Sequence, residues 1–222
     1  MNISVFDVVG PVMIGPSSSH TAGASRLARI AKLIVAEPFS HVSFGLSGSF
    51  ARTYRGHGTD RALVAGALGL REDDERLANS FAIAESRGLT WDFYEAELDN
   101  LHENSVEMRF HLNDGRVKKI VGSSVGGGRI LIHSFDGFQV EYTAQSSALI
   151  LRQEDRPGVV SEVTKVLAKN GINIGVMRLS RRARGDEAFC VIEVDGTISP
   201  DIAKAVEQVD GILAAKAINL EQ

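Results

Sequence analysis

The first strong pattern along the chain is that of an amphipathic helix. Its apolar positions recur at spacings of i, i+3, i+4 and i+7, at Leu27, Ile30, Ala31 and Ile34. A second helical run spans residues 61–68, and Gly66 and Gly69 are expected to interrupt or end it. A third run, residues 73–88, begins with charged side chains and ends at a glycine. The front half of the chain is therefore expected to hold several short helices.

Strand patterns accompany these helices. Residues 3–9 are rich in β-branched side chains, and residues 42–46 alternate between apolar and polar. Two hairpins follow, formed by 106–112 with 117–121 around Asp114-Gly115 and by 130–133 with 138–142 around Asp136-Gly137. The first part of the chain is therefore expected to be α/β, with a mixed and largely antiparallel sheet.

The remainder of the chain has a different order of elements. The pattern predicts strand 148–153, helix 159–170, strands 173–180 and 188–194, helix 200–209 and strand 212–218. This βαββαβ order is the ferredoxin-like arrangement. The fold class expected for the whole chain is therefore α/β, of the α+β type. A short polar stretch, 144–147, precedes it, so we expect two domains, 1–145 and 146–222.

Composition narrows the class of protein. At 222 residues and 44% hydrophobic, the chain is long enough for two modest cores. Its net charge of −4 argues against a nucleic-acid partner, and no apolar run approaches the length of a membrane span. The one basic cluster, 178–184, is expected to be a solvated hairpin between two strands. We therefore expect a cytoplasmic protein without a nucleic-acid or membrane partner.

Cys190 is the only cysteine. A single thiol permits no intrachain disulfide and cannot ligate an iron–sulfur cluster, which needs several thiolates. The apolar neighbours of Cys190 predict a buried thiol inside a strand. The six histidines also lack the His-x-x-x-His spacing of a helical metal site, so no metal site is expected in this chain alone.

Polar groups crowd together just before the first amphipathic helix. Residues 17–23 read Ser-Ser-Ser-His-Thr-Ala-Gly, and Ser19 or Thr21 is expected to cap the helix. A helix start surrounded by hydroxyls attracts an anion such as a carboxylate. His20 adds a titratable group there. The alternative is a well-capped helix with a surface histidine.

A second segment repeats this arrangement before residues 61–68. Gly56-His57-Gly58-Thr59-Asp60 places a histidine and a hydroxyl at a helix start, with Thr59 or Asp60 as the expected cap. Capping alone would explain both of these side chains. If the two helix starts converge in the fold, they form a polar pocket with two histidines.

These segments carry a resemblance to a known family. Residues 15–21, 47–51 and 56–60 resemble the β region of bacterial iron–sulfur L-serine dehydratase. The tail resembles an ACT domain through Asp155-Arg156-Pro157-Gly158 and Gly171-Ile172-Asn173-Ile174. Together the two resemblances cover essentially the whole chain.

The resemblance implies a subunit of an enzyme that converts L-serine to pyruvate and ammonia. It implies that a [4Fe–4S] cluster is bound by a partner α chain, and that this chain helps to close the active site. By the same resemblance, His20 would be catalytic. The substrate-binding residues would be Ser17, Ser18, Ser19, Thr21, His57, Thr59 and Asp60.

The tail suggests an allosteric site and self-association. Gly158 lets the backbone approach a ligand, Val159 opens the helix behind it, and the Asn173 amide is suited to hold a small amino acid. The alternative is that these residues form only a strand-to-helix turn. ACT domains commonly pair, so we expect the chain to self-associate through its tail.

Two other classes of function stay open. One is an amino-acid sensor without chemistry, since the first domain also resembles the allosteric substrate-binding domain of some phosphoglycerate dehydrogenases. The other is a self-sufficient hydrolase or metalloenzyme. The hydrolase reading is disfavoured because Gly45-Leu46-Ser47-Gly48-Ser49 ends in serine where the nucleophile elbow requires glycine. No Gly-x-Gly-x-x-Gly is present either, which argues against a dinucleotide site.

Overall fold

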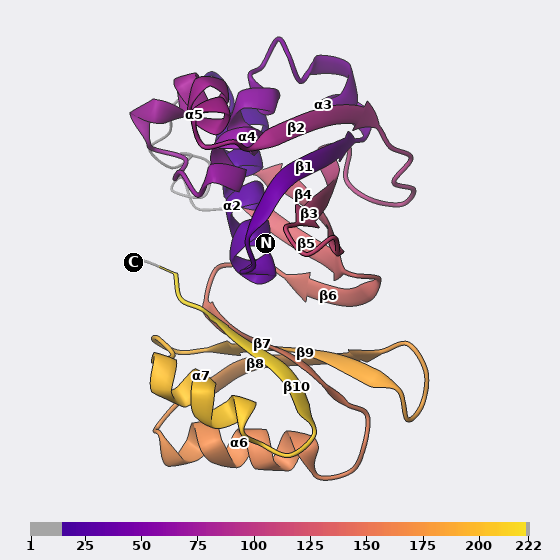
Figure 1. Ribbon diagram of the computed structural model, residues 1–222, viewed down its shortest axis with the longest axis vertical. Helices are drawn as coiled ribbons and strands as arrows, with labels where there is room; N and C mark the ends of the chain where they lie inside the picture. Colours follow the sequence, from indigo (N-terminus) through magenta and orange to yellow (C-terminus); the bar gives the residue numbers. More distant parts are fainter. Residues whose placement is uncertain (1–14, 221–222) are drawn as a thin grey trace, which may run out of the picture. The chain divides into compact units, whose positions relative to one another are not determined.

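The computed structural model describes residues 15–220 (Figure 1). By its internal contacts the chain divides into two units, 1–136 and 137–222. The predicted domain boundary at residue 145 stays a prediction, since this division falls earlier, inside a hairpin turn. The predicted strand at residues 3–9 lies outside the described residues.

Among the described residues, six helical segments form one layer of the first unit. They are η1 (Ser18–Gly23, a π-helical turn), α2 (Ala24–Val35), α3 (Gly48–Thr53), α4 (Thr59–Leu68), η2 (Glu75–Asn79, a 3₁₀ turn) and α5 (Ser80–Ser86). The apolar stripe predicted along 27–34 is buried throughout and belongs to α2. α2 packs directly against α4, so the two form the centre of this layer.

Gly66 makes the close approach of α2 and α4 possible. It lies inside α4 and does not interrupt it, whereas Gly69 ends the helix in a left-handed conformation at φ 90°. A Cβ on Gly66 would overlap the carbonyl oxygen of Ser25 and lie 2.7 Å from the Cβ of Ala28. This position therefore needs glycine for packing between helices.

Six strands form the sheet beside these helices. They are β1 (Phe39–Leu46), β2 (Thr90–Glu95), β3 (Ser105–Leu112), β4 (Val117–Gly126), β5 (Arg129–Phe135) and β6 (Phe138–Tyr142), in the order β2-β1-β3-β4-β5-β6. β1 pairs with β2 in parallel, while the β1–β3, β3–β4 and β4–β5 pairs are antiparallel. Both hairpins and the largely antiparallel sheet are thereby confirmed. The strand β2 and the helix α3 were not predicted.

The two faces of this sheet differ in chemistry. Side chains such as Val42, Phe44 and Phe110 are fully buried in the core. The opposite face carries a polar network in which the Asp92 carboxylate contacts His41 Nε2 at 2.8 Å and accepts a hydrogen bond from Ser43 Oγ at 2.7 Å. Half of the histidines, including His41 and His111, are thus explained by strand positions away from the helix starts.

The second unit holds the predicted βαββαβ arrangement. Its elements are β7 (Ser147–Glu154), α6 (Val159–Lys169), β8 (Ile174–Arg181), β9 (Glu187–Val194), α7 (Pro200–Glu207) and β10 (Ile212–Ile218). The sheet is antiparallel in the order β10-β7-β9-β8, which is the ferredoxin-like order. Cys190 lies in its core, and burial raises the pKa of this thiol to about 12. β6 also belongs to this unit by contacts, with Phe138 stacked on Phe189 at 5.7 Å.

The basic cluster of the tail is a solvated hairpin, as predicted. Arg178 and Arg181 lie on β8 and are about half exposed. Arg178 pairs with Glu141 and with the buried Glu193, and Arg181 pairs with Asp155. These arginines are already neutralised within the unit.

Candidate functional site

The chain enters α2 through the π-helical turn η1. Ser17 is in an extended conformation, with φ −143° and ψ 127°, and its Oγ accepts a hydrogen bond from the His20 backbone N–H at 3.1 Å. Ser17 is therefore the cap, and the prediction that Ser19 or Thr21 caps the helix is wrong, because both already lie inside the helical turn. π-Helical turns are rare and are frequent at functional sites.

The His20 ring lies among groups that come from separate elements. Its Nδ1 is 3.5 Å from Ser17 Oγ, and its Nε2 is 3.3 Å from Ser49 Oγ at the start of α3. The Phe50 ring meets the His20 ring edge-on, with 5.3 Å between centroids. Both ring nitrogens thus have a hydroxyl partner while an aromatic ring covers part of the ring.

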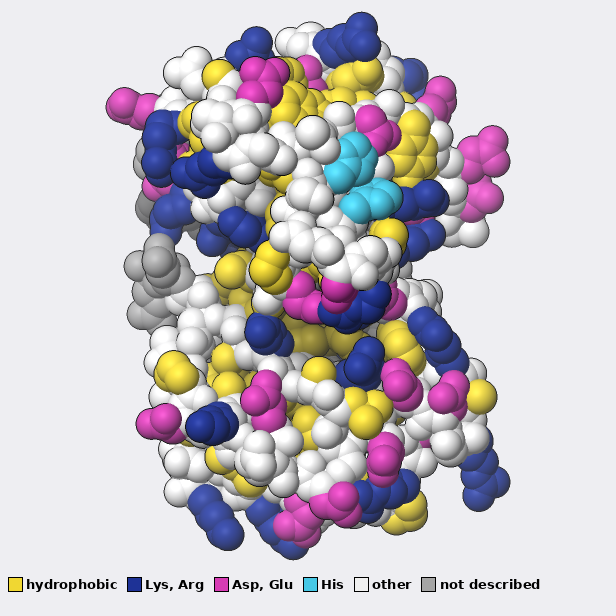
Figure 2. Space-filling model, viewed as in Figure 1, with side chains coloured by type: hydrophobic (Ala, Val, Ile, Leu, Met, Phe, Trp, Pro, Cys, Tyr) yellow, Lys and Arg dark blue, Asp and Glu magenta, His cyan; other side chains and the backbone are white. Residues whose placement is uncertain are grey.

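The two polar segments converge, which was the condition for a pocket with two histidines. The centroids of the His20 and His57 rings are 4.7 Å apart. Thr21 Oγ1 donates a hydrogen bond to the His57 carbonyl oxygen at 3.3 Å, which ties the π turn to the second segment. The described residues of the first unit contain a second such pair, His41 and His111, with 4.8 Å between ring centroids, and Figure 2 shows one pair of adjacent histidine side chains on the face it draws. The structure therefore contains a polar site with two adjacent imidazoles.

The helix cap predicted in the second segment is wrong. α4 begins at Thr59 after Gly58, which has φ 71° and makes no side-chain cap. Asp60 Oδ1 accepts a hydrogen bond from the Arg61 N–H beside it, at 2.8 Å. Thr59 is fully buried, and among the described residues its Oγ1 has no hydrogen-bond partner. Neither side chain is hydrogen-bonded to His20.

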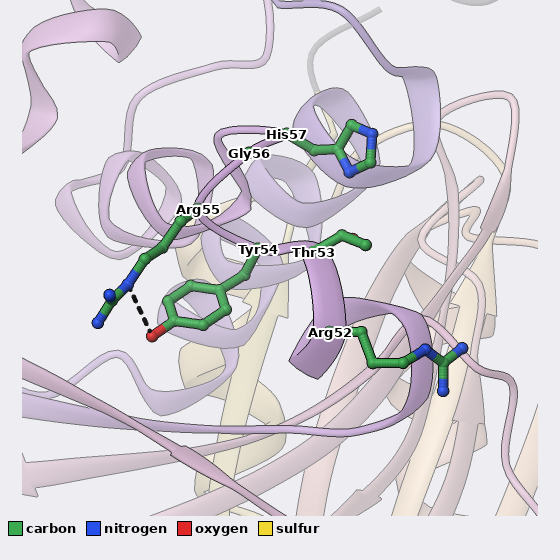
Figure 3. A pocket seen from close by; sticks show the side chains of 6 residues that line it. All are labelled: Arg52, Thr53, Tyr54, Arg55, Gly56 and His57. Atoms are coloured by element: carbon green, nitrogen blue, oxygen red, sulfur yellow. Dashed lines mark hydrogen bonds between the residues drawn. The ribbon is translucent and has the colours of Figure 1, made fainter.

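A pocket of about 580 Å³ opens beside His57. Residues 52–57 line it, and Figure 3 shows Tyr54 and Arg55 turned together to one side of this loop. Arg55 Nε donates a hydrogen bond to Tyr54 Oη at 3.1 Å. Arg52 forms an exposed ion pair with Glu103 at 3.6 Å. Arg52 and Arg55 thus line the same pocket as His57.

The surroundings of His20 favour the neutral imidazole. Burial lowers the pKa of His20 below its ordinary value of 6.5, and the neighbouring His57 lowers this pKa further. The carboxylate of Glu103 acts in the opposite direction and raises it in part. A neutral imidazole accepts a proton near neutral pH, which is the requirement for a general base.

Several groups of the site were not predicted. Ser49 and Phe50 contact the His20 ring, and Glu103 acts on its charge. Ser124 of β4 donates a hydrogen bond to the Ser19 carbonyl oxygen at 2.9 Å. The Ser-Gly-Ser string at 47–49 was a signal for the first of these, whereas the serine pair at 123–124 lies in an ordinary strand and gave none.

In the tail, the predicted allosteric residues lie at the start of α6 and before β8. Gly158 has φ 95° and precedes the buried Val159, the first residue of α6. Asn173 Nδ2 donates a hydrogen bond to Asp195 Oδ2 at 2.7 Å. The Asn173 amide nitrogen is therefore already held by a carboxylate of the same unit.

No helix of the described residues is long and apolar enough to span a membrane. Within residues 15–220, no group of three or more His, Cys, Asp or Glu side chains is arranged to hold a metal ion.

Comparison with known proteins identifies relatives of the whole chain. The beta chain of L-serine dehydratase from Peptoniphilus asaccharolyticus is 38% identical over 218 residues, which is 98% of each chain. A probable L-serine dehydratase beta chain from Bacillus subtilis is 37% identical over 215 residues, 97% of each chain. D-3-phosphoglycerate dehydrogenase of Bacillus subtilis is 22% identical over 198 residues, covering 89% of this chain and 37% of that protein.

Two protein families match separate parts of the chain. The family described as "Serine dehydratase beta chain" matches residues 4–84, and the ACT domain family matches residues 147–211. Among solved structures, the ACT domain of a Chlorobium tepidum GTP pyrophosphokinase is 20% identical, covers 32% of this chain and 95% of that one, and has a TM-score of 0.26. Because it is 37–38% identical to such subunits over nearly the full length of both chains, the chain belongs to the L-serine dehydratase β-chain family, with an ACT domain at its C-terminal end.

Proposed function

We propose that this chain is the β subunit of a cytoplasmic enzyme that converts L-serine to pyruvate and ammonia together with an α chain. The observation that supports this most is the convergence of His20, His57 and the serine-rich π turn in a chain of this family. A hydroxyl-lined site with a neutral imidazole suits an amino-acid substrate from which a proton must be removed.

The cluster of the proposed enzyme belongs on the α chain. Cys190 is the only cysteine, and it is a buried thiol with a raised pKa, so the residues of this chain do not fit a [4Fe–4S] cluster. Held by the partner, such a cluster would supply Lewis-acid chemistry at the serine hydroxyl. The contribution of this chain is then to bind and orient serine and to handle a proton.

Each group of the site has a proposed part in that reaction. The hydroxyls of Ser17, Ser18, Ser19 and Thr21 bind the carboxylate or amine of serine at the start of the π turn. His20 takes or orients the proton at the α-carbon, and His57, Thr59 and Asp60 flank it. Loss of the α-proton and of hydroxide leaves an enamine, whose imine tautomer is hydrolysed by water to pyruvate and ammonia.

The purified chain alone should be inactive and free of stoichiometric iron, because it offers a single buried thiol. Co-expression with an α chain should give oxygen-sensitive pyruvate formation from serine. Iron analysis and a pyruvate assay on the two preparations check this. Turnover by the chain alone, with one iron or more per molecule, would contradict the assignment.

The acidic limb of the pH profile should lie below the ordinary histidine range. Activity requires neutral His20, whose pKa burial holds under 6.5, so kcat/KM should fall only below that pH. Glu103→Gln removes the charge that raises this pKa and should move the limb to still lower pH. An acidic limb at or above pH 6.5 that does not move in the Glu103→Gln variant would exclude His20 as the titrating group.

The tail is proposed to respond to a small amino acid and to pair subunits. If serine is the effector, Asn173→Ala should raise the serine concentration needed for the response and leave the maximal rate unchanged, since an effector acts only through its differential affinity. Asn170→Ala is the matched control, because Asn170 Nδ2 only donates to the Val166 carbonyl oxygen. Equal serine dependence in both variants would reduce the tail to an assembly element.

A sensor without chemistry is the second candidate. The similarity to a D-3-phosphoglycerate dehydrogenase favours it, because a stretch similar to 89% of this chain makes up 37% of a protein named as a different enzyme. The co-expression experiment separates the two, since a sensor forms no pyruvate with any partner.

A further inference from the structure

One buried side chain ties the π turn of His20 to the sheet. Ser124 of β4 is fully buried, and its Oγ donates a 2.9 Å hydrogen bond to the carbonyl oxygen of Ser19, the residue directly before His20. A buried hydroxyl that loses its acceptor is costly, so this contact is a strong constraint on the position of the turn.

The contact depends on close approach at Gly23, the last residue of the turn. A Cβ on Gly23 would overlap Ser124 Oγ and lie 2.9 Å from Ser124 Cβ. Any side chain at position 23 would therefore push the turn away from β4. Gly23 and Ser124 form a matched pair across the interface between the turn and the sheet.

The residues at the start of β3 support Ser124 and the ring of His20 together. The Ser124 N–H donates to the Asn104 carbonyl oxygen at 2.9 Å, and the Ser49 N–H donates to the Glu103 carbonyl oxygen at 2.7 Å. Ser49 in turn places its Oγ 3.3 Å from His20 Nε2. Two adjacent carbonyl groups thus hold both the backbone before His20 and the hydroxyl at its ring.

We propose that Ser124 is a positioning residue for His20. Its hydroxyl holds the π turn so that the His20 ring faces Ser49 and His57, and Ser124 itself touches no reacting atom. The positioning is a property of this chain alone, and its effect on turnover rests on the proposed function.

Ser123 provides the matched control. It is also fully buried, it precedes Ser124 in β4, and its side chain points to the opposite face of the sheet. There its Oγ lies 2.6 Å from both Ser105 Oγ and His133 Nε2. Ser123→Ala therefore removes hydrogen bonds of the same kind from the same strand without releasing the turn.

The decisive measurement is the pKa of His20 by NMR in the isolated full-length chain, with the resonance assigned through His20→Gln. Burial is the main cause that lowers this pKa, followed by His57 and opposed by Glu103. Release of the turn should expose the ring, so Ser124→Ala should raise the His20 pKa toward 6.5 and Ser123→Ala should not. An unchanged pKa in Ser124→Ala, or the same shift in both variants, would overturn the proposal.

A double-mutant cycle tests the steric half of the contact. Gly23→Ala should also raise the His20 pKa. The double variant with Ser124→Ala should raise this pKa no further than Gly23→Ala alone. Additive shifts would refute the pairing of the two residues. If Ser124→Ala proves unstable, Gly23→Ala alone decides the proposal, because an unchanged His20 pKa in that variant would overturn it.

Turnover in the complex with the α chain separates the two proposals. Ser124→Ala should lower kcat by about tenfold to a hundredfold, the range expected when a reacting group is displaced by about 1 Å. Ser123→Ala should leave kcat near the wild-type value. If the wild-type complex forms no pyruvate, the proposed function fails while the NMR result still stands.

Discussion

His20→Ala should lower kcat by about 10²–10⁴-fold in the complex with the α chain, the range typical for loss of a general acid or base. The ring lies between two hydroxyls and against His57 at a helix start, which is a poor place for a side chain that serves only packing. Pyruvate formation under saturating serine measures the effect. Thermal unfolding should change little, because the two hydroxyl contacts of the ring are long, at 3.5 and 3.3 Å.

His41→Ala is the matched control for this prediction. His41 is a half-buried histidine of the same unit with three polar contacts of 3.2 Å or less, to Thr90, Ser43 and Asp92, but it lies on the polar face of the sheet. The His41→Ala variant should be less stable than the wild type, and the kcat of its complex should be unchanged. A His20→Ala complex with near-normal kcat and KM would leave His20 only a structural part in the site.

Gly66→Ala should destabilise the first unit by about 1–3 kcal/mol or more, the usual cost of overpacking a core. The new methyl group would collide with the Ser25 carbonyl oxygen and with Ala28, so α2 and α4 must separate. Alanine favours a helix by about 1 kcal/mol over glycine, so any net loss of stability is due to packing. Denaturant unfolding monitored by circular dichroism measures the change.

Gly56→Ala is the corresponding control for stability. Gly56 lies in the same unit, and the nearest atom to a Cβ there, the Thr53 carbonyl oxygen, is at an ordinary 3.7 Å. Its free energy of unfolding should stay within about 0.5 kcal/mol of wild type, as is usual for surface substitutions. A Gly66→Ala variant as stable as the wild type would contradict a tight contact between α2 and α4.

The fold could be predicted where the pattern of the chain was local. Asp114-Gly115 and Asp136-Gly137 predicted both hairpins, and the ferredoxin-like tail followed from its order of strands and helices. The strand β2 escaped because it lies at the edge of the sheet, and its apolar Trp91 and Phe93 are only half-buried. The helix α3 escaped because six residues are too few to show a helical period.

The site could be predicted in outline only. Residue types at two helix starts indicated that His20 and His57 belong together, and their rings do meet. The cap before α2 was wrongly predicted because a π turn has no sequence signature distinct from that of an ordinary helix start. The contact of Ser19 with Ser124 could not be predicted, since it depends on the tertiary packing of the turn on β4.

That contact also orders events in time. The hydrogen bond from Ser124 to Ser19 joins residues 105 positions apart in the chain. One hydrogen bond does little to offset the entropy cost of closing so long a loop. It therefore forms only after other contacts have closed that loop. On the ribosome, the residues of the His20 turn are synthesised long before those of β4. The chain therefore acquires the geometry of its histidine site late in synthesis, once the sheet that anchors the turn exists.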